Sequence, residues 1–365
     1  MKKALLFIFV AGFILRLYLS LQGYSGDVNN HISWGRDILL NGPQGIYDRE
    51  FYFRYGTLTP NYPPLVLFFF TASYALYEIL YTTSWWLNNN ISLFPSNIIF
   101  FFQGINTIPA FLKLPAIFAD LGIAYYVYLF SKKLVKNEKW RLLSTILVLF
   151  NPAFFYNSAL WGQVEALPTL FVVASFYSLL YSQRIYLPAV IFTIALLSKQ
   201  NAVIFAPIFL LFFWKKNGVV KLLKSGAVSL LLFWMLFLPF NNGNLLIYSF
   251  DIYWNKILTN SVSDYVTYHA FNFWTLFVGQ EKVHDFTPLF LGFSFKIVGY
   301  LLFVGVLIST LWKLLKHKID PYMTLYSATI ISFASFLFMT RLHERHLGSV
   351  LPFLLLLSVK EKKFI

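Results

Sequence analysis

The sequence predicts an all-α, polytopic transmembrane helical bundle of ten to twelve helices, with twelve favoured. Two observations lead to this fold class. First, 58% of the 365 residues are hydrophobic and only 12% are charged, and the mean hydropathy is +0.64, whereas a soluble domain carries about twice that share of charge. Second, apolar runs alternate along the chain with short lysine clusters. The bilayer is therefore the solvent in which this chain folds.

Apolar runs that approach the length of a bilayer crossing occur throughout the chain. A crossing needs about 20 mainly apolar residues, and several runs are shorter, so we expect their polar ends to reach a cavity. The first run follows two lysines as in a signal peptide, but no small-x-small cleavage site comes after it. We expect it to be a helix whose Arg16 snorkels at the far end. The expected spans are Ala4–Ser20, Pro64–Tyr81, Pro109–Phe130, Leu142–Tyr156, Val164–Tyr181, Tyr186–Leu197, Val203–Trp214, Ala227–Phe240, Pro288–Trp312, Tyr322–Met339 and Leu347–Val359.

The short basic connections predict the orientation. Cytoplasmic loops are rich in lysine and arginine, and the net charge of +14 is concentrated in such clusters and not in a basic domain that would bind nucleic acid. The clusters are Lys2 and Lys3, Lys132–Arg141, Arg184, Lys215–Lys224, Lys313–Lys318 and Lys360–Lys363. If all are cytoplasmic, one more crossing or half-crossing is needed before residue 132, and Ile98–Thr107 is the segment where we expect it.

Residues 1–365 form one domain in this interpretation, with two long outer segments. Leu21–Pro63 and Asn241–Thr287 are polar yet rich in aromatic residues, which is typical of amphipathic segments that lie in the membrane interface. The chain has no cysteine, so a disulfide framework, a thiolate zinc site and a cysteine nucleophile are excluded.

The first outer segment opens with "SGDVNNHISWGRDI", which places Asp27 just after the first span. A carboxylate at that level can accept a proton from a substrate hydroxyl. Alternatively, Asp27 caps an interfacial helix that runs through His31 and Trp34. The two roles can coexist.

Two further outer connections carry polar groups beside apolar spans. In "NSALWGQVEA", Gln163 and Glu165 stand where one span ends and the next begins, and an acid there is costly unless it faces a cavity or a partner. In "LLSKQNAVIF", Lys199 and Gln200 lie on the side where lysine is not expected as an anchor. Lys199 either snorkels or attracts an anion such as phosphate.

The densest charged cluster is "TRLHERHLG", before the last span. On a helix, Arg341 and Arg345 would share a face at i and i+4, which predicts a phosphate clamp with His343 beside it and Glu344 orienting one guanidinium. The alternative is a solvated charged turn. The second long segment contains "YHAFNFWTLFVG", whose Asn272 suits a sugar contact as well as an aromatic belt. No metal-ligand spacing or glycine-rich phosphate loop occurs.

Taken in order, seven motifs resemble the Gpi18-like mannosyltransferases within the GT-C membrane glycosyltransferases. They are "GD" with Trp34 seven residues later, "YPPL", "KLPAIFADL", "NSALWGQVEA", "SKQNAVIFAP", "AFNFW" and "RLHERHL". The resemblance implies a GT-C bundle, Asp27 as the catalytic base, His343, Glu344 and Arg345 as the "HER"-type motif, and Lys199 and Gln200 as the outer Lys-x-Gln-type motif. It also implies a polyprenyl-phosphate sugar donor. Glu165 departs from the family pattern, which usually has Asp.

The residues suit that chemistry independently, because a polyprenyl phosphate leaves as a stable anion and needs no general acid. We therefore expect a hexosyltransferase of the cell membrane, most plausibly for mannose, that acts at the non-cytoplasmic face without a cofactor. Asp27 would be the base, Arg345, His343, Arg341 and Lys199 would bind the donor phosphate, and a lipid-linked or surface glycan would be the acceptor. Trp34, His31, Gln163, Glu165, Gln200, Glu344 and Asn272 would bind substrate.

Two other hypotheses remain open at this point. A transporter or lipid flippase would use the intramembrane Asp120 and Glu165 as coupling groups. A catalytically inactive subunit of a glycan assembly complex would keep the donor site and lack turnover.

Overall fold

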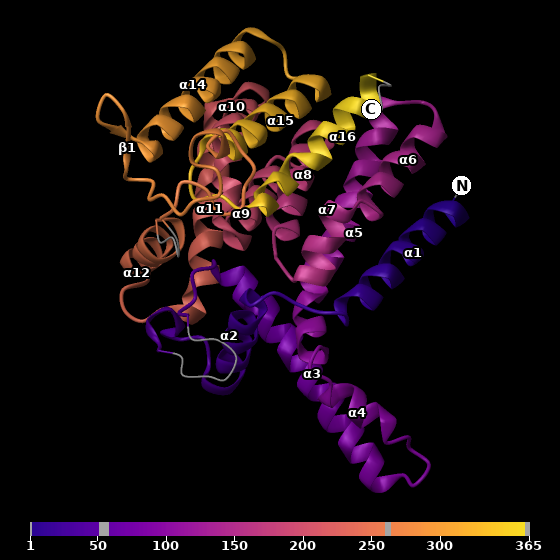
Figure 1. Ribbon diagram of the computed structural model, residues 1–365. Coiled ribbons are helices and arrows are strands. Elements are labelled where there is room, and N and C mark those ends of the chain that lie inside the picture. Colours follow the sequence, from indigo (N-terminus) through magenta and orange to yellow (C-terminus); the bar gives the residue numbers. More distant parts are fainter. Residues whose placement is uncertain (1, 51–57, 260–263, 362–365) are drawn as a thin grey trace.

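The computed structural model describes residues 2–50, 58–259 and 264–361, and nearly all of its regular structure is helical (Figure 1). Within these ranges, seven helices have the length and apolarity needed to cross a membrane, and two shorter apolar helices, Ala166–Tyr181 and Leu187–Ser198, lie between them in the chain. The expected all-α membrane bundle is confirmed. The seven are Lys3–Ser20, Pro64–Asn90, Thr107–Leu134, Glu138–Trp161, Val219–Phe240, Phe295–Lys316 and Pro321–Phe338.

In the first two thirds of the chain most helices lie where spans were expected, but Pro64–Asn90 continues nine residues past the expected end at Tyr81, and Val219–Phe237 begins eight residues before the expected start at Ala227. The expected span Pro288–Trp312 differs, because its first residues form a small antiparallel strand pair and the helix begins only at Phe295, after the cap residue Ser294. The elements are α1 (Lys2–Ser20), α2 (Asp27–Asn41), η1 (Ile46–Asp48), α3 (Pro64–Asn90), α4 (Asn97–Gln103), α5 (Thr107–Leu134), α6 (Glu138–Leu149), α7 (Pro152–Phe155), η2 (Tyr156–Trp161), α8 (Ala166–Tyr181), α9 (Leu187–Ser198), η3 (Gln200–Phe205), α10 (Ala206–Asn217), α11 (Val219–Phe237), η4 (Leu238–Phe240), α12 (Leu245–Asp251), η5 (Ile252–Leu258), α13 (Thr275–Val278), β1 (Pro288–Phe290), β2 (Phe293–Ser294), α14 (Phe295–Lys316), α15 (Pro321–Phe338), η6 (Glu344–Ser349) and α16 (Leu351–Glu361).

Several of the lysine clusters meet at one end of the bundle. The ammonium of Lys133, near the end of α5, lies 5.4 Å from the ring centroid of Tyr181, the last residue of α8. Lys215 on α10 donates to the carbonyl of Leu314 near the end of α14, at 2.7 Å, and Lys360 on α16 lies over a ring at the start of α15. These contacts bring together helix ends that are far apart in the sequence, as expected of clusters on one side of a bilayer. Lys362 and Lys363 lie outside the described residues.

The first helix runs antiparallel to α5 and is tied to it by a buried ion pair. Arg16 is fully buried, and its Nε donates to Oδ2 of Asp120 at 2.9 Å. Its Nη1 donates to the carbonyl of Leu149 at 2.7 Å, and Ser158 donates to the same carboxylate oxygen at 2.5 Å. The prediction that Arg16 snorkels is therefore wrong: the carboxylate on α5 lies within reach inside the bundle, where an unpaired charge is costly.

Ile98–Thr107 does not form the full crossing that was one of the two alternatives expected for this segment. This segment holds α4, which has seven residues and a length of about 10 Å, too short for a bilayer. Tyr77 on α3 donates to the carbonyl of Phe102 at 3.0 Å and packs 5.7 Å from Phe111 near the start of α5. The second half of α3 therefore extends beyond the start of α5 and does not pack along the length of α5.

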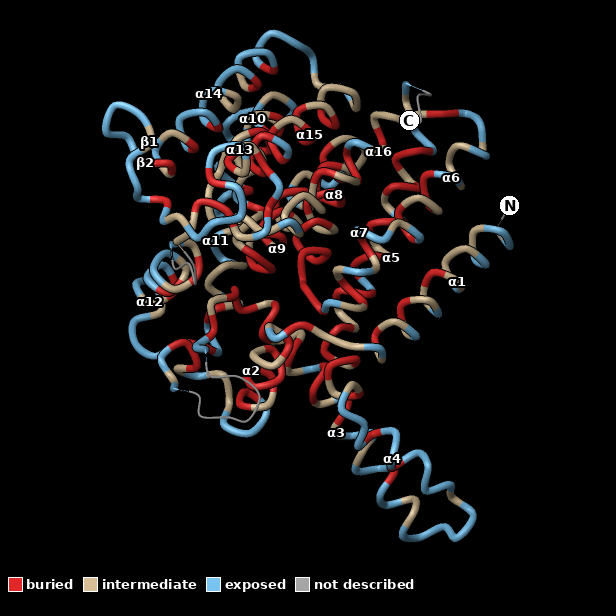
Figure 2. Tube along the Cα trace, viewed as in Figure 1, coloured by how far each residue is buried: buried red, intermediate tan, exposed pale blue. Residues whose placement is uncertain are grey.

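Figure 1 shows α4 and the far half of α3 projecting from the body, away from both chain ends, and Figure 2 shows most of this projection exposed. Its exposed side chains are largely apolar, as in Trp86 and Phe100. The helix that crosses the membrane in the direction opposite to α1 is therefore α5 and not α3. No further crossing is needed between α1 and α5.

In the first outer segment, α2 packs tightly on α3. A Cβ at Gly35 would lie 2.7 Å from the carbonyl oxygen of Phe70, so only glycine permits this approach of the two backbones. Trp34 is buried and donates from Nε1 to the carbonyl of Leu58 at 2.7 Å. The start of α2, with Asp27, is thereby fixed against the bundle.

The Arg16–Asp120 pair makes a testable contribution to stability. Asp120→Ala leaves the guanidinium buried without its counter-charge, so we expect a loss of about 3–5 kcal/mol. Replacing both partners with apolar residues, as in Arg16→Met with Asp120→Leu, should recover most of that loss. Thermal unfolding in detergent measures both variants, and an Asp120→Ala protein as stable as the wild type would contradict a structural role for the pair.

Candidate active site

Asp27 lies at the first position of α2, with its side chain about half exposed. Its Oδ2 accepts a hydrogen bond from Nε2 of Gln163 at 2.7 Å and lies 3.7 Å from Nη2 of Arg345. The N-cap residue is Gly26, and no side-chain cap bond forms there. The capping alternative is therefore not what the structure shows, although the carboxylate still faces the positive end of the helix dipole.

The carboxylate of Glu165 is the centre of an ion cluster beside Asp27. Its Oε1 lies 2.7 Å from Nζ of Lys199 and 3.1 Å from Nε of Arg345. All three side chains are largely buried, with relative exposures of 8%, 5% and 14%. Burial alone raises the pKa of Glu165, but the two cations outweigh it, so the net pKa is lowered and the carboxylate stays ionised.

Lys199 and Arg345 remain charged in this cluster. Burial lowers the pKa of each, but Glu165 reverses this effect, and the net pKa of both side chains is raised. The Lys199 ammonium also lies 5.0 Å from the ring centroid of Tyr62, a cation–π distance. Tyr62 was not among the predicted site residues, although an aromatic residue beside the tandem prolines of "YPPL" at an outer helix start was a usable signal.

A local departure from α-helix places Gln163 and Glu165. Residues Tyr156–Trp161 form a π-helical turn, a feature common at functional sites, and Gly162 follows with φ of 81°. A Cβ at Gly162 would lie 2.5 Å from Cγ2 of Val28 and 3.2 Å from Cε of Lys113. Glycine is thus required, and the chain reverses so that Gln163 meets Asp27.

Lys113 lies under this turn and was not among the predicted site residues. It is buried, and its ammonium donates to the carbonyl of Ser20 at 2.9 Å and to that of Gly23. The last turn of α1 is therefore tied to α5 just before Asp27. Lys113 belongs to "KLPAIFADL", where its polar head among apolar residues was the available signal.

Three acceptor oxygens of predicted site residues are buried and have no hydrogen-bond partner within the described ranges. They are Oε1 of Gln163, Oε2 of Glu165 and Oε1 of Gln200. An unsatisfied buried acceptor costs about 1–3 kcal/mol. Hydroxyl groups, which donate hydrogen bonds, would satisfy all three.

Arg341 does not take part in the cluster, and the predicted two-arginine helical face is wrong. Arg341 adopts φ of 63°, and its guanidinium forms a bidentate pair with the buried carboxylate of Asp285, with distances of 2.8 and 3.0 Å. Helical structure begins only at Glu344, as the 3₁₀ segment η6. The left-handed residue turns the chain out of α15, so Arg341 faces the outer segment while Arg345 faces Glu165.

The histidines of "RLHERHL" are neutral. The backbone N–H of His343 donates to Nδ1 of His346 at 2.9 Å, and the His343 ring packs 4.5 Å from that of Tyr268. Burial lowers the pKa of His343 to about 4 and that of His346 to about 3, and the nearby Arg345 and Lys199 act in the same direction. Of the four side chains predicted to bind the donor phosphate, only Lys199 and Arg345 are therefore positively charged beside Glu165.

The remaining predicted residues have mainly structural contacts. His31 stacks on Phe70 at 4.2 Å between ring centroids and lies with Trp34 in an aromatic layer behind the cluster. The amide of Asn272 donates to the carbonyl of Phe336 at 3.1 Å and accepts from the N–H of Trp274. Glu344 is exposed and forms no ion pair within the described ranges, so Glu165 orients Arg345 in its place.

The cluster lies at the end of the bundle opposite the lysine clusters. Glu165 directly precedes α8, whose last residue, Tyr181, lies beside Lys133. Lys199 follows α9, and Arg345 follows α15, which begins near Lys360. The carboxylates and the two buried cations therefore collect at one end and the anchoring lysines at the other.

Comparison with solved structures identifies the fold. The chain is similar to the oligosaccharyltransferase of Archaeoglobus fulgidus in its apo crystal structure, with a TM-score of 0.55 and 12% identity, over 97% of this chain and 50% of that one. The chain has the GT-C fold. It spans about half the length of the archaeal protein, and at this identity the likeness concerns the fold alone. No protein-family model and no curated protein matches the chain.

The buried histidines predict an acid-dependent loss of stability. Burial lowers the pKa of His31 to about 3, below the 6.5 of an unfolded histidine. Its stabilising contribution is therefore complete above pH 6.5 and is lost as the pH falls toward 3, by about 2 kcal/mol at pH 5. His31→Phe should show a smaller drop in Tm between pH 8 and pH 5 than the wild type. His317→Phe, at an exposed histidine, should not, and an unchanged slope for His31→Phe would contradict this account.

Proposed function

We propose that this protein is a GT-C glycosyltransferase that transfers a hexose, most plausibly mannose, from a polyprenyl-phosphate donor to an acceptor hydroxyl. The observation that carries the proposal is the half-exposed carboxylate of Asp27 beside the buried pair of Lys199 and Arg345, with 3.7 Å between Asp27 and Arg345. The shared fold supports it, because the similar archaeal protein is an oligosaccharyltransferase. The seven sequence motifs support the finer assignment to the Gpi18-like enzymes.

The proposed reaction divides the work between two groups. Asp27 accepts the proton of the acceptor hydroxyl while that oxygen bonds to the anomeric carbon of the donor. The bond between this carbon and the phosphate oxygen breaks, and the phosphate leaves with the electron pair. Arg345 and Lys199 stabilise the charge that develops on it. Gln163 holds one oxygen of Asp27, so the other oxygen is available to the hydroxyl.

A lipid-linked substrate also fits an apolar groove beside the cluster. The groove has a volume of about 390 Å³ and lies between α3, α5 and α8, lined by residues such as Ala72, Phe118 and Phe171. Leu167, two residues after Glu165, belongs to the same wall. A prenyl chain lying here would bring its phosphate to the level of the cluster.

We assign the reaction to the non-cytoplasmic face. The lysine clusters collect at the opposite end of the bundle, and such clusters mark the cytoplasmic side. This orientation makes a lipid-linked or surface glycan the natural acceptor class.

Removal of the base tests the proposal. With purified protein, a radiolabelled polyprenyl-phosphate hexose and a lipid-linked acceptor, Asp27→Asn should lower the transfer rate about 100-fold to 10,000-fold while donor binding is kept. Asp48→Asn, a half-exposed carboxylate in the same outer segment, is the matched control and should keep activity. Transfer by Asp27→Asn at the wild-type rate would reject the assignment.

The guanidinium of Arg345 tests the phosphate site separately. Arg345→Gln removes charge-assisted hydrogen bonds to the leaving phosphate, so kcat/KM for the donor should fall about 10- to 100-fold. Arg345→Lys keeps the charge but loses the planar fork and should fall less. Arg184→Gln, at the lysine-rich end, serves as the control. Donor kinetics unaffected by Arg345→Gln would exclude this residue from the phosphate site.

A further inference from the structure

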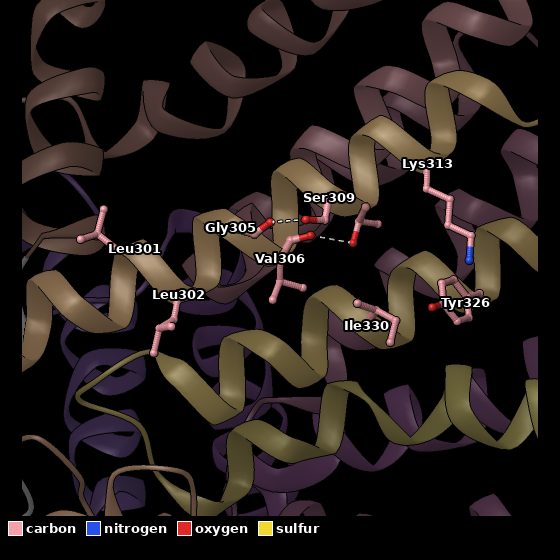
Figure 3. Close-up of a pocket in the computed structure, with 9 residues that line it drawn as sticks. Leu301, Leu302, Gly305, Val306, Ser309, Lys313, Tyr326 and Ile330 are labelled. Carbon is pink, nitrogen blue, oxygen red and sulfur yellow. Dashed lines mark hydrogen bonds between the residues drawn. The ribbon is translucent and has the colours of Figure 1, made fainter.

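A second apolar groove runs between α14 and α15, remote from the candidate active site (Figure 3). It has a volume of about 460 Å³, and its walls include Leu301, Leu302 and Val306 on α14 and Ile330 on α15. The flanking leucines are exposed, Leu301 to 60%. Since α14 and α15 are both long enough to span the membrane, this groove opens toward the surface that lipid chains contact.

The dimensions of the groove suit one acyl chain. From Leu301 to Lys313, α14 rises about 18 Å, close to half of the roughly 30 Å hydrocarbon thickness of a bilayer. Gly305 forms part of the floor, and a Cβ added there would meet no atom within 4 Å. A side chain at this position would therefore enter the groove without colliding with the protein.

The groove ends at a lysine that has no acidic partner. The ammonium of Lys313 lies 4.4 Å from the ring centroid of Tyr326 on α15. Lys313 forms no ion pair within the part of the chain that the structure describes. The hydroxyls of Ser309 and Thr310 donate to carbonyls of their own helix, at 2.8 Å each (Figure 3). Lys313 is thus the charged group that faces a ligand lying in the groove.

Other cations increase the positive charge at this end. Lys215 donates to the carbonyls of Leu314 and His317, at 2.7 and 2.6 Å, and so reaches the last turn of α14. Lys360 lies 4.8 Å from the ring centroid of Tyr322, one turn before Tyr326. Basic pockets between transmembrane helices commonly receive anionic lipid headgroups.

We propose that this groove binds one anionic glycerophospholipid, with an acyl chain along α14 and the phosphate at Lys313. A zwitterionic lipid suits the site less well, because its own ammonium would face the lysines. The polyprenyl-phosphate donor is also less suited, because Tyr326 lies twelve residues, or about 18 Å, from the end of α15 that leads to Arg345. The lipid would stabilise the α14–α15 pair by mass action.

Lipid binding to the delipidated protein tests this site without any measurement of turnover. Native mass spectrometry in detergent should show one phosphatidylglycerol bound more tightly than phosphatidylcholine of the same chains. Lys313→Gln should weaken phosphatidylglycerol binding about fivefold and leave phosphatidylcholine unchanged. Lys316→Gln, whose ammonium lies over Trp312 of its own helix, is the matched charge control.

A second pair of variants tests the groove itself. Gly305→Leu should weaken the binding of both lipids, whereas Gly226→Leu on α11, which also has open space at its Cβ, should not. Equal affinity of the wild type for the two lipids, or wild-type binding by both Lys313→Gln and Gly305→Leu, would overturn the proposal. Displacement of phosphatidylglycerol by equimolar polyprenyl phosphate would assign the groove to that lipid instead and likewise overturn it.

Discussion

The ion cluster around Glu165 is the interaction on which the rest of the candidate site depends. An unpaired charge is costly in a bundle surrounded by lipid, and this carboxylate pairs with both Lys199 and Arg345. Glu165 precedes α8, Lys199 follows α9, and Arg345 precedes α16. The ion pairs therefore join helix ends that are up to 180 residues apart in the sequence. Removing the carboxylate would leave two buried cations facing each other. The cluster therefore sets where the helices meet, and Asp27 is positioned through Arg345 and Gln163.

Charge balance in the cluster bears on how it could receive a phosphate. Asp27 and Glu165 supply two carboxylates, and Lys199 and Arg345 supply two cations, while the lowered pKa values of the half-buried His343 and His346 keep both rings neutral. These four side chains together therefore carry no net charge. In the proposed reaction a donor phosphate would bring net negative charge. The guanidinium could meet this charge because only its Nε is bonded to Glu165, which leaves other N–H donors. Such a balanced cluster holds its donors in place before the reaction, so little reorganisation is needed as charge develops.

Composition and charge patterning were enough to predict the membrane bundle, since apolar length and lysine clustering are local properties of the chain. The sequence also predicted four residues of the site, because polar groups at outer span ends are costly unless they face a cavity or a partner. These residues are Gln163, Glu165, Lys199 and Arg345. The predictions were wrong where the position of a side chain depends on a residue far away in the sequence. Arg16 was expected to reach the interface, yet a carboxylate 104 residues away lies 2.9 Å from it. Arg341 was expected to share a helical face with Arg345, yet Asp285 and a left-handed backbone direct it elsewhere. The path of α3 depends on its packing against α5, which no local pattern reveals.

The same contacts weigh against the transport hypothesis. Coupling groups in a transporter exchange ions or protons between two sides, and therefore need a path and alternative partners near the midplane. Asp120 is instead enclosed with Arg16 and Ser158, and Arg16 also donates to the carbonyl of Leu149 on α6, so that four elements, α1, α5, α6 and η2, meet here. Glu165 lies at one end of the bundle, next to Asp27. Asp120 joins helices through its ion pair, and Glu165 holds Lys199 and Arg345 in place. Among the described residues, neither carboxylate has the alternative partners that alternating access requires. Both suit a rigid scaffold, which is what the proposed transferase reaction requires.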